Sequence, residues 1–157
     1  MSSGMSGELA AGSVFRLPEP VVVTRQRLDA LAAALGQPIP AVQAPPTYLF
    51  VLAEPAFEAL FTDPRLGLDL SRIIHVDQSF EYVRPVVVGD VLDVSLTIGK
   101  VRVRGEAEFI TVLGEVVDTV AGAIVATFST TLLHRNPVGG AASAAGHLEG
   151  STREVTP

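Results

Sequence analysis

The sequence predicts an α+β domain in which an antiparallel sheet wraps around a long central helix. Residues 47–61 are apolar almost all round, and four alternating stretches joined by short turns follow them. A helix that is apolar on most sides must be buried on most sides, and strands joined by short turns pair antiparallel. A sheet curved around the helix buries both surfaces, which is a layered α+β architecture.

The composition of the 157 residues fits one folded domain and argues against several kinds of site. Hydrophobic residues make up 48% and charged residues 18%, which is enough for a core. No cysteine is present, so disulfides and thiolate chemistry are excluded. Three histidines argue against a histidine-only metal site, and we expect neither a metal nor a cofactor.

Charge and hydropathy bear on the binding partners of the chain and on its location in the cell. The net charge of −6 argues against nucleic-acid binding, which needs clustered lysine and arginine. No apolar run reaches the ~18 residues of a membrane span, and the first residues lack the pattern of a signal peptide. We therefore expect a cytoplasmic protein with no membrane span.

We expect one domain over residues 13–135. Residues 1–12 are small and polar and predict a disordered N-terminus. Residues 136–157 are rich in Gly, Ala, Ser and Thr and predict a flexible C-terminal tail.

The domain begins with a predicted strand over residues 14–23, which Pro18 and Pro20 break and place at a sheet edge. Thr24 then predicts the N-cap of a helix that ends at Gly36. The helical spacing gives this helix one buried stripe, formed by Leu28, Leu31, Ala32 and Leu35.

The central helix is predicted over residues 47–61. Thr47 predicts its N-cap. Glu54 and Glu58 lie four apart and predict its one solvent-exposed edge. Pro55 removes a backbone hydrogen bond and predicts a kink.

The first of the four later strands, predicted over residues 73–84, carries most of the candidate site residues. Alternation puts one apolar set on a shared face: Ile74, Val76, Phe80 and Tyr82. It puts a polar set on the other face: His75, Asp77, Ser79 and Glu81. Gln78 falls on the apolar face, where it either bonds a ligand or partner or is satisfied within the chain.

The other strands are predicted over residues 92–103, 107–117 and 124–133. In the first of them the apolar phase slips by one residue at Gly99, which predicts a β-bulge there. The turn residues predict tight connections at 89–90, 104–105 and 119–122.

Four segments in order resemble one known family. They are Ala44-Pro45-Pro46-Thr47, Asp63-Pro64-Arg65-Leu66-Gly67, the stretch 74–92 with its Arg84-Pro85 and Gly89-Asp90, and Thr130-Thr131-Leu132. They are similar to segments of hot-dog domains in the MaoC-like dehydratase superfamily. The chain most resembles the N-terminal-type domains, including the non-catalytic subunits of (R)-3-hydroxyacyl-ACP dehydratases.

The resemblance implies a hot-dog dimer in which strand 73–84 pairs with its counterpart in a second chain. It places Ile74, Val76, Phe80 and Tyr82 at the dimer interface. The start of the central helix, Pro46, Thr47 and Tyr48, is then expected to contact an acyl-thioester substrate, together with Gln78. The thioester would be carried by an acyl carrier protein or by coenzyme A.

Active members of this family resemble the pattern Gly-Asp-x-Asn-Pro-x-His, whose Asp and His transfer the protons of the reaction. Here Gln37 stands at the Asp position and Val42 at the His position, and the segment between Gly36 and Ala44 is short. Neither side chain can transfer a proton near pH 7. The resemblance therefore implies a non-catalytic subunit that pairs with a catalytic MaoC-like partner.

Two alternatives remain open from the sequence. The chain could be a self-sufficient homodimeric hydratase or thioesterase that uses His75 and Asp77, or another carboxylate such as Glu81. It could also be a binding module that holds an acyl thioester without chemistry. His75 and Asp77 could equally be polar residues of a surface or interface, since no third group is identifiable to orient them.

The remaining charged residues carry weaker hypotheses. Lys100, Arg102 and Arg104 form a basic ladder that could meet the phosphates of coenzyme A or an acidic carrier protein, or could simply be solvated. Arg72 and Arg84 lie elsewhere. His134 and His147 are expected to be exposed to solvent.

Overall fold

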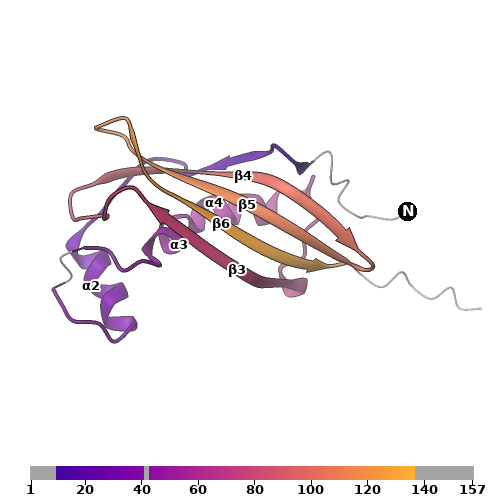
Figure 1. Cartoon of the computed structure of the whole chain (residues 1–157), viewed down its shortest axis with the longest axis horizontal. Helices are drawn as coiled ribbons and strands as arrows, with labels where there is room; N and C mark the ends of the chain where they lie inside the picture. Colours follow the sequence, from indigo (N-terminus) through magenta and orange to yellow (C-terminus); the bar gives the residue numbers. More distant parts are fainter. Residues whose placement is uncertain (1–9, 41–42, 137–157) are drawn as a thin grey trace, which may run out of the picture.

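The computed structural model describes residues 10–40 and 43–136, and it consists of one antiparallel sheet with helices on one side (Figure 1). The expectations for residues 1–9 and 137–157, including His147, and for Val42 lie outside the described residues. The described part begins with a buried Ala10, and the Gly12 N–H donates to the Ile98 carbonyl at 2.7 Å. None of the described helices is long and apolar enough to cross a membrane.

The sheet confirms the predicted α+β architecture. Its order is β1-β4-β5-β6-β3, with the short β2 also paired to β4, and every pairing is antiparallel. The strands are β1 Val14–Arg16, β2 Val21–Val22, β3 Ile73–Tyr82, β4 Val91–Arg104, β5 Ala107–Asp118 and β6 Ala123–Arg135. The break between β1 and β2 contains Pro18 and Pro20, and β1 lies at an edge, as predicted.

The opposite edge of the sheet is β3, which follows the 3-10 turn η1, Leu70–Arg72. This ten-residue strand pairs with β6 on one side only. The other side presents the backbone donors and acceptors of a long strand, and such an edge is a template for pairing with another chain.

The helix α2, Arg25–Ala34, begins where the sequence predicts. The Thr24 hydroxyl accepts a hydrogen bond from the Arg27 N–H at 3.3 Å, which is an N-cap. Leu28 and Ala32 of the predicted stripe are buried, whereas Leu35, at the C-cap, is 49% exposed.

The central helix is divided in two, close to the kink that Pro55 predicts. α3 spans Tyr48–Leu52, α4 spans Glu54–Thr62, and Ala53 lies between them. Pro55 stands in the first turn of α4, where its missing N–H costs no helical hydrogen bond. A proline that would kink a continuous helix here starts a new one.

Two of the three register shifts in the sheet set which residues of β3 and β4 face the helices. The register of β4 shifts between Ile98 and Lys100, which confirms the bulge predicted at Gly99. The register of β3 shifts between His75 and Asp77, so Val76 has no partner on β6. The sequence did not predict this second bulge.

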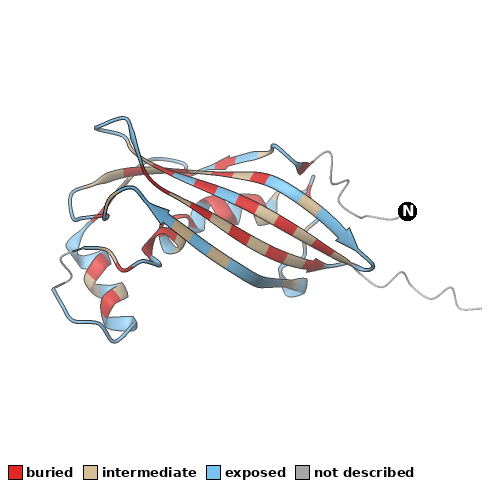
Figure 2. Ribbon diagram, viewed as in Figure 1, coloured by how far each residue is buried: buried red, intermediate tan, exposed pale blue. Residues whose placement is uncertain are grey.

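The core lies between the inner face of the sheet and the helices. Along β4, β5 and β6 buried residues alternate with exposed or half-buried ones (Figure 2). The inner residues of β4 are fully buried up to the bulge: Leu92, Val94, Leu96 and Ile98. They pack with Leu49, Phe57 and Leu60 of the two central helices in one cluster.

Candidate functional site

The start of α3 is tied to the end of β3. The Tyr82 hydroxyl donates a hydrogen bond to the Pro46 carbonyl, and the Ala44 N–H donates to the Val86 carbonyl at 2.8 Å. Burial raises the pKa of Tyr82 to about 12, so the phenol stays protonated and keeps its donor at neutral pH. Pro46, Thr47 and Tyr48, the predicted substrate contacts, therefore sit at a rigid junction beside Tyr82.

Thr47 and Tyr48 are the two polar side chains at this junction, and their surroundings differ. Thr47 occupies the N-cap position of α3, but its hydroxyl makes no capping hydrogen bond, so the predicted cap is wrong. Tyr48 is 2% exposed, and its buried hydroxyl lies beside the Arg27 guanidinium. Burial raises the pKa of Tyr48, although the Arg27 guanidinium lowers it in part.

Gln78 lies on the inner face of β3, as the alternation predicted, and its oxygen is satisfied within the chain. It stands opposite Thr130, whose hydroxyl donates to Gln78 Oε1 at 2.7 Å. Four residues of strand, or ~13 Å, separate it from Tyr82. The structure therefore does not bring Gln78 together with the Pro46–Tyr48 junction.

An apolar groove runs along the exposed side of α3 and α4. Its volume is about 340 Å³, and it is lined by Phe50, Val51, Glu54, Phe57, Glu58 and Phe61. The groove corrects the expectation that Glu54 and Glu58 form the only wet edge, because Val51 is 51% exposed. Sequence reasoning missed this site, although the recurrence of phenylalanine at 50, 57 and 61 marks one helical face.

His75 borders this groove from β3. Its ring stacks on Phe50 with centroids 5.2 Å apart and an interplanar angle of 22°. Residues directly opposite each other in an antiparallel pair point to the same side. His75 stands opposite the buried Leu132 and so faces the helices, whereas Asp77 stands opposite Thr131 and faces the other side.

The prediction that His75 and Asp77 share a face is therefore wrong. The bulge at Val76 inserts one residue between them and reverses the alternation. The same bulge separates the predicted interface residues: Ile74 faces outward with Leu133, while Phe80 and Tyr82 face inward with Phe128 and Ala126. His75 and Asp77 cannot act together on one substrate.

A carboxylate–imidazole pair does occur, at a place the sequence did not indicate. His134 is 3% exposed, which contradicts the expectation of a solvated side chain, and its Nδ1 lies 3.2 Å from Oε2 of Glu108, which is 1% exposed. The Asp69 N–H donates to His134 Nε2 at 3.3 Å. Nε2 is thus an acceptor and Nδ1 carries the proton, so this buried pair joins strands and presents no group to a substrate.

The family positions for proton transfer lie beyond α2. Gln37 is exposed, and its N–H donates to the Ala32 carbonyl at 2.8 Å, which closes the helix end after Gly36 at φ +68°. The described residues contain no cluster of three or more metal-binding side chains.

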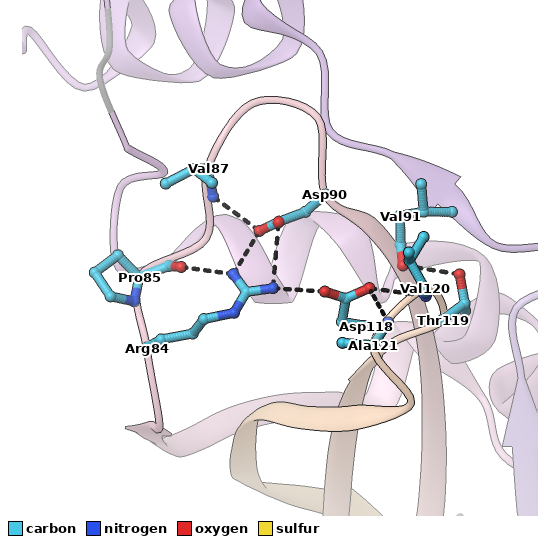
Figure 3. Close-up of polar contacts among 9 residues, drawn as sticks. All are labelled: Arg84, Pro85, Val87, Asp90, Val91, Asp118, Thr119, Val120 and Ala121. Carbon is cyan, nitrogen blue, oxygen red and sulfur yellow. Dashed lines mark hydrogen bonds and ion pairs between the residues drawn. The ribbon is translucent and has the colours of Figure 1, made fainter.

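The Arg84-Pro85 and Gly89-Asp90 turn builds a structural ion cluster (Figure 3). The Arg84 guanidinium lies between Asp90, at 2.8 Å, and Asp118, at 2.9 Å. Asp90 also accepts the Val87 N–H at 3.0 Å. Arg84 is therefore occupied in joining the β3–β4 connection to the β5–β6 turn. Arg72 likewise pairs with Asp69, at 3.3 Å.

Acid should weaken this cluster through Asp118. The backbone N–H groups of Ala121 and Val120, and then Arg84, hold the pKa of Asp118 below its usual 3.8. A folded-state pKa below the unfolded one gives stability that is present above the unfolded pKa and is lost as pH falls through the folded one. We expect Asp118→Asn to unfold at a lower urea concentration than the wild type at pH 6, and the two midpoints to converge as the pH falls below 3.8. Asp63→Asn, whose carboxylate pairs only with Arg65 two residues away, is the control and should cost less at pH 6.

Comparison with known proteins identifies the family. Residues 10–128 match the family described as FAS1-like, dehydratase domain region. A UPF0336 protein of Cutibacterium acnes is 40% identical over 135 residues, which cover 83% of this chain and 94% of that protein. A UPF0336 protein of Streptomyces coelicolor is 44% identical over 108 residues, which cover 68% of this chain and 70% of that protein.

Solved structures agree with this assignment. The truncated HadBC (3R-hydroxyacyl-ACP dehydratase) complex of Mycobacterium tuberculosis aligns with a TM-score of 0.68 at 25% identity, covering 79% of this chain and 96% of that one. A MaoC-like dehydratase aligns with a TM-score of 0.70 at 24% identity, covering 82% of this chain and 43% of that one. The fold is that of MaoC-like hot-dog proteins, and the chain belongs to the FAS1-like dehydratase family.

Proposed function

We propose that this chain is a non-catalytic subunit of a heteromeric (R)-specific 3-hydroxyacyl-thioester dehydratase, or enoyl-thioester hydratase. The proposal rests on Gln37 and Val42, because the resemblance puts them where active members carry their Asp and His. General acid–base catalysis is worth roughly 10²–10⁴-fold per group. The misaligned His75 and Asp77 and the buried Glu108–His134 pair offer no replacement.

The edge strand and the groove support a partner that completes the site. A second hot-dog chain that pairs with the free edge of β3 would continue the sheet, and its own helices would lie beside the groove of α3 and α4. Ile74 and Val76, 49% and 51% exposed, would then be covered. The apolar groove suits one wall of an acyl tunnel, with the Pro46–Tyr48 junction at its end. The partner would remove the α-proton and protonate the hydroxyl that leaves as water.

The setting we propose is cytoplasmic fatty-acid, steroid side-chain or polyketide metabolism, with an acyl group carried by coenzyme A or an acyl carrier protein. The similarity to the HadBC complex supports a hot-dog partner subunit. A binding module without chemistry is the second candidate, since the apolar groove of α3 and α4 would hold an acyl group without any proton-transferring residue.

Capture through a tag on this chain, in the source organism, tests the proposal. We expect a second hot-dog protein carrying Gly-Asp-x-Asn-Pro-x-His to co-purify, and the pair to dehydrate 3-hydroxyacyl thioesters.

His75→Ala or Asp77→Asn should leave kcat of the pair within about twofold. Val51→Trp, which fills the groove, should lower kcat/KM for long acyl chains more than for short ones, whereas Glu58→Gln should not. Turnover by this chain alone, abolished by His75→Ala, would contradict the proposal, and tight acyl binding with no partner would favour the binding module.

A further inference from the structure

A buried imidazole holds the segment that leads from α4 into β3. His134 of β6 is 3% exposed and stands opposite Ile73, the first residue of β3. Its Nε2 accepts a hydrogen bond from the Asp69 N–H at 3.3 Å, although Asp69 lies 65 residues earlier in the chain. Leu66 and Leu68, just before this point, pack against the core. The contact therefore fixes the last part of the connection between α4 and the edge strand.

The two partners of the imidazole determine where its proton lies. A backbone N–H only donates, so Nε2 must be the nitrogen without a proton when it accepts from Asp69. Nδ1 then carries the proton and donates it to Oε2 of Glu108, 3.2 Å away. His134 is neutral in this closed arrangement. A further proton can go only to Nε2, which is the nitrogen that binds Asp69.

That further proton would place two donors against each other. An imidazolium has an N–H on both nitrogens and no acceptor, so Nε2–H would face the Asp69 N–H across 3.3 Å. A buried donor without an acceptor is costly, and here both donors would lack one. If the Asp69 peptide moves away, water can reach both groups, while Nδ1–H keeps its bond to Glu108. Protonation therefore favours an open arrangement of the connection.

The charged groups of the surrounding elements already have other partners. The Asp69 carboxylate accepts from the Ser71 N–H at 3.0 Å and pairs with Arg72 at 3.3 Å, so it is bound within its own turn. Strand β4 contributes an apolar residue, Val103, to the row of His134. The other titratable and charged groups are Glu108 on Nδ1, His75 stacked on Phe50, and Asp63 paired with Arg65.

We propose that His134 is a pH-sensitive switch for the start of β3. The neutral imidazole binds the Asp69 N–H and closes the connection, and the protonated imidazole releases it. The open arrangement binds one proton more than the closed one, so a fall in pH raises the open-to-closed ratio by up to about tenfold per pH unit. Histidine ordinarily changes its charge between pH 5 and 8, which is the range to search.

The switch would also act on a chain paired to β3, and this consequence alone rests on the proposed function. Ile73 begins the free edge and is joined to the released turn through Arg72. An open connection leaves the first residues of this edge without a fixed position. Pairing with a second chain then costs more ordering entropy, so the proposed partner should bind more weakly in acid.

Hydrogen exchange of the Asp69 N–H, measured on the full chain alone, tests the switch. The measured quantity is the protection factor between pH 8 and pH 5, with the fully buried Val112 of β5 as the internal reference. We expect protection at Asp69 to fall at least tenfold over this range, while that at Val112 changes less than twofold. Nitrogen-15 NMR of the His134 ring should show Nε2 gaining its proton over the same range.

Two variants separate the switch from general loosening in acid. In His134→Gln the amide oxygen can accept from Asp69 and the amide N–H can donate to Glu108, but the side chain does not titrate. Protection at Asp69 should then persist at every pH. Glu108→Gln keeps the imidazole but removes the carboxylate that stabilises its charged form, so the loss of protection should move to lower pH.

Several results would overturn the proposal. They are wild-type protection at Asp69 that does not depend on pH, the same loss in His134→Gln, a parallel loss at Val112, and an Nε2 that already carries a proton at pH 8. None of these measurements involves a partner. Failure of the switch is therefore distinguishable from failure of the proposed function, which co-purification tests.

Discussion

Alanine at position 114 should destabilise the protein by about 3 kcal/mol, near the upper end for an overpacked core. A Cβ built on Gly114 would lie 2.1 Å from Cζ of Phe128, its direct partner on β6. Phe128 cannot move away cheaply, because its ring packs against Phe57 and Phe80, with centroids 6.5 and 6.0 Å away. Urea unfolding at fixed protein concentration measures the loss.

Gly99→Ala is the matched control for this prediction. Its Cβ would meet Leu113 Cδ1 at 3.1 Å, and that flexible side chain can shift. We expect a loss below 1 kcal/mol, since small shifts of this kind are absorbed. Adding Phe128→Leu to Gly114→Ala should recover part of the stability. An unfolding midpoint of Gly114→Ala equal to that of the wild type would show that Phe128 does not confine this position.

The second large effect is expected at the buried Glu108–His134 pair. Glu108→Ala leaves the His134 Nδ1–H buried without an acceptor. We expect it to lower the free energy of unfolding by roughly 3–5 kcal/mol, the usual range when one partner of a buried pair is removed. Glu108→Gln keeps an oxygen acceptor and should cost less. The measurement is the free energy of unfolding at neutral pH.

A double-mutant cycle separates this pair from simple loss of packing. Glu108→Leu with His134→Phe should cost less than the sum of the single changes, because the double variant leaves neither member of the pair buried without the other. Strictly additive losses would contradict a direct interaction. Hydrogen exchange at the Asp69 N–H should also quicken in His134→Phe, since that N–H donates to the imidazole.

The large elements could be predicted from local signals. The ends of several elements could be predicted from single residues, namely Thr24, Pro18, Pro20 and the turn glycines. Helix capping, the proline ring and a positive φ each act within a few residues. The phase slip at Gly99 was visible for the same reason, since apolar residues on both sides mark the two faces. The expectation that Gln37 and Val42 stand at the family's Asp and His positions also needed only the sequence, because it comes from the resemblance.

The side-chain arrangement of the candidate site could be predicted less well than the helices and strands. Nothing in residues 73–84 marks Val76 as a bulge, because apolar and polar residues alternate on both sides of it. That bulge alone decides that His75 and Asp77 face opposite ways. The burial of His134 was equally hidden, since its partner Glu108 lies 26 residues away and they meet only when β5 and β6 pair.

The sequence by itself determined the fold class, the family and most strand positions. These depend on residue identity and on periodicity along the chain. Tertiary structure decided which side chains share a face and where the apolar groove opens. Those features depend on cross-strand register, and a shift of one residue turns every following side chain to the opposite side.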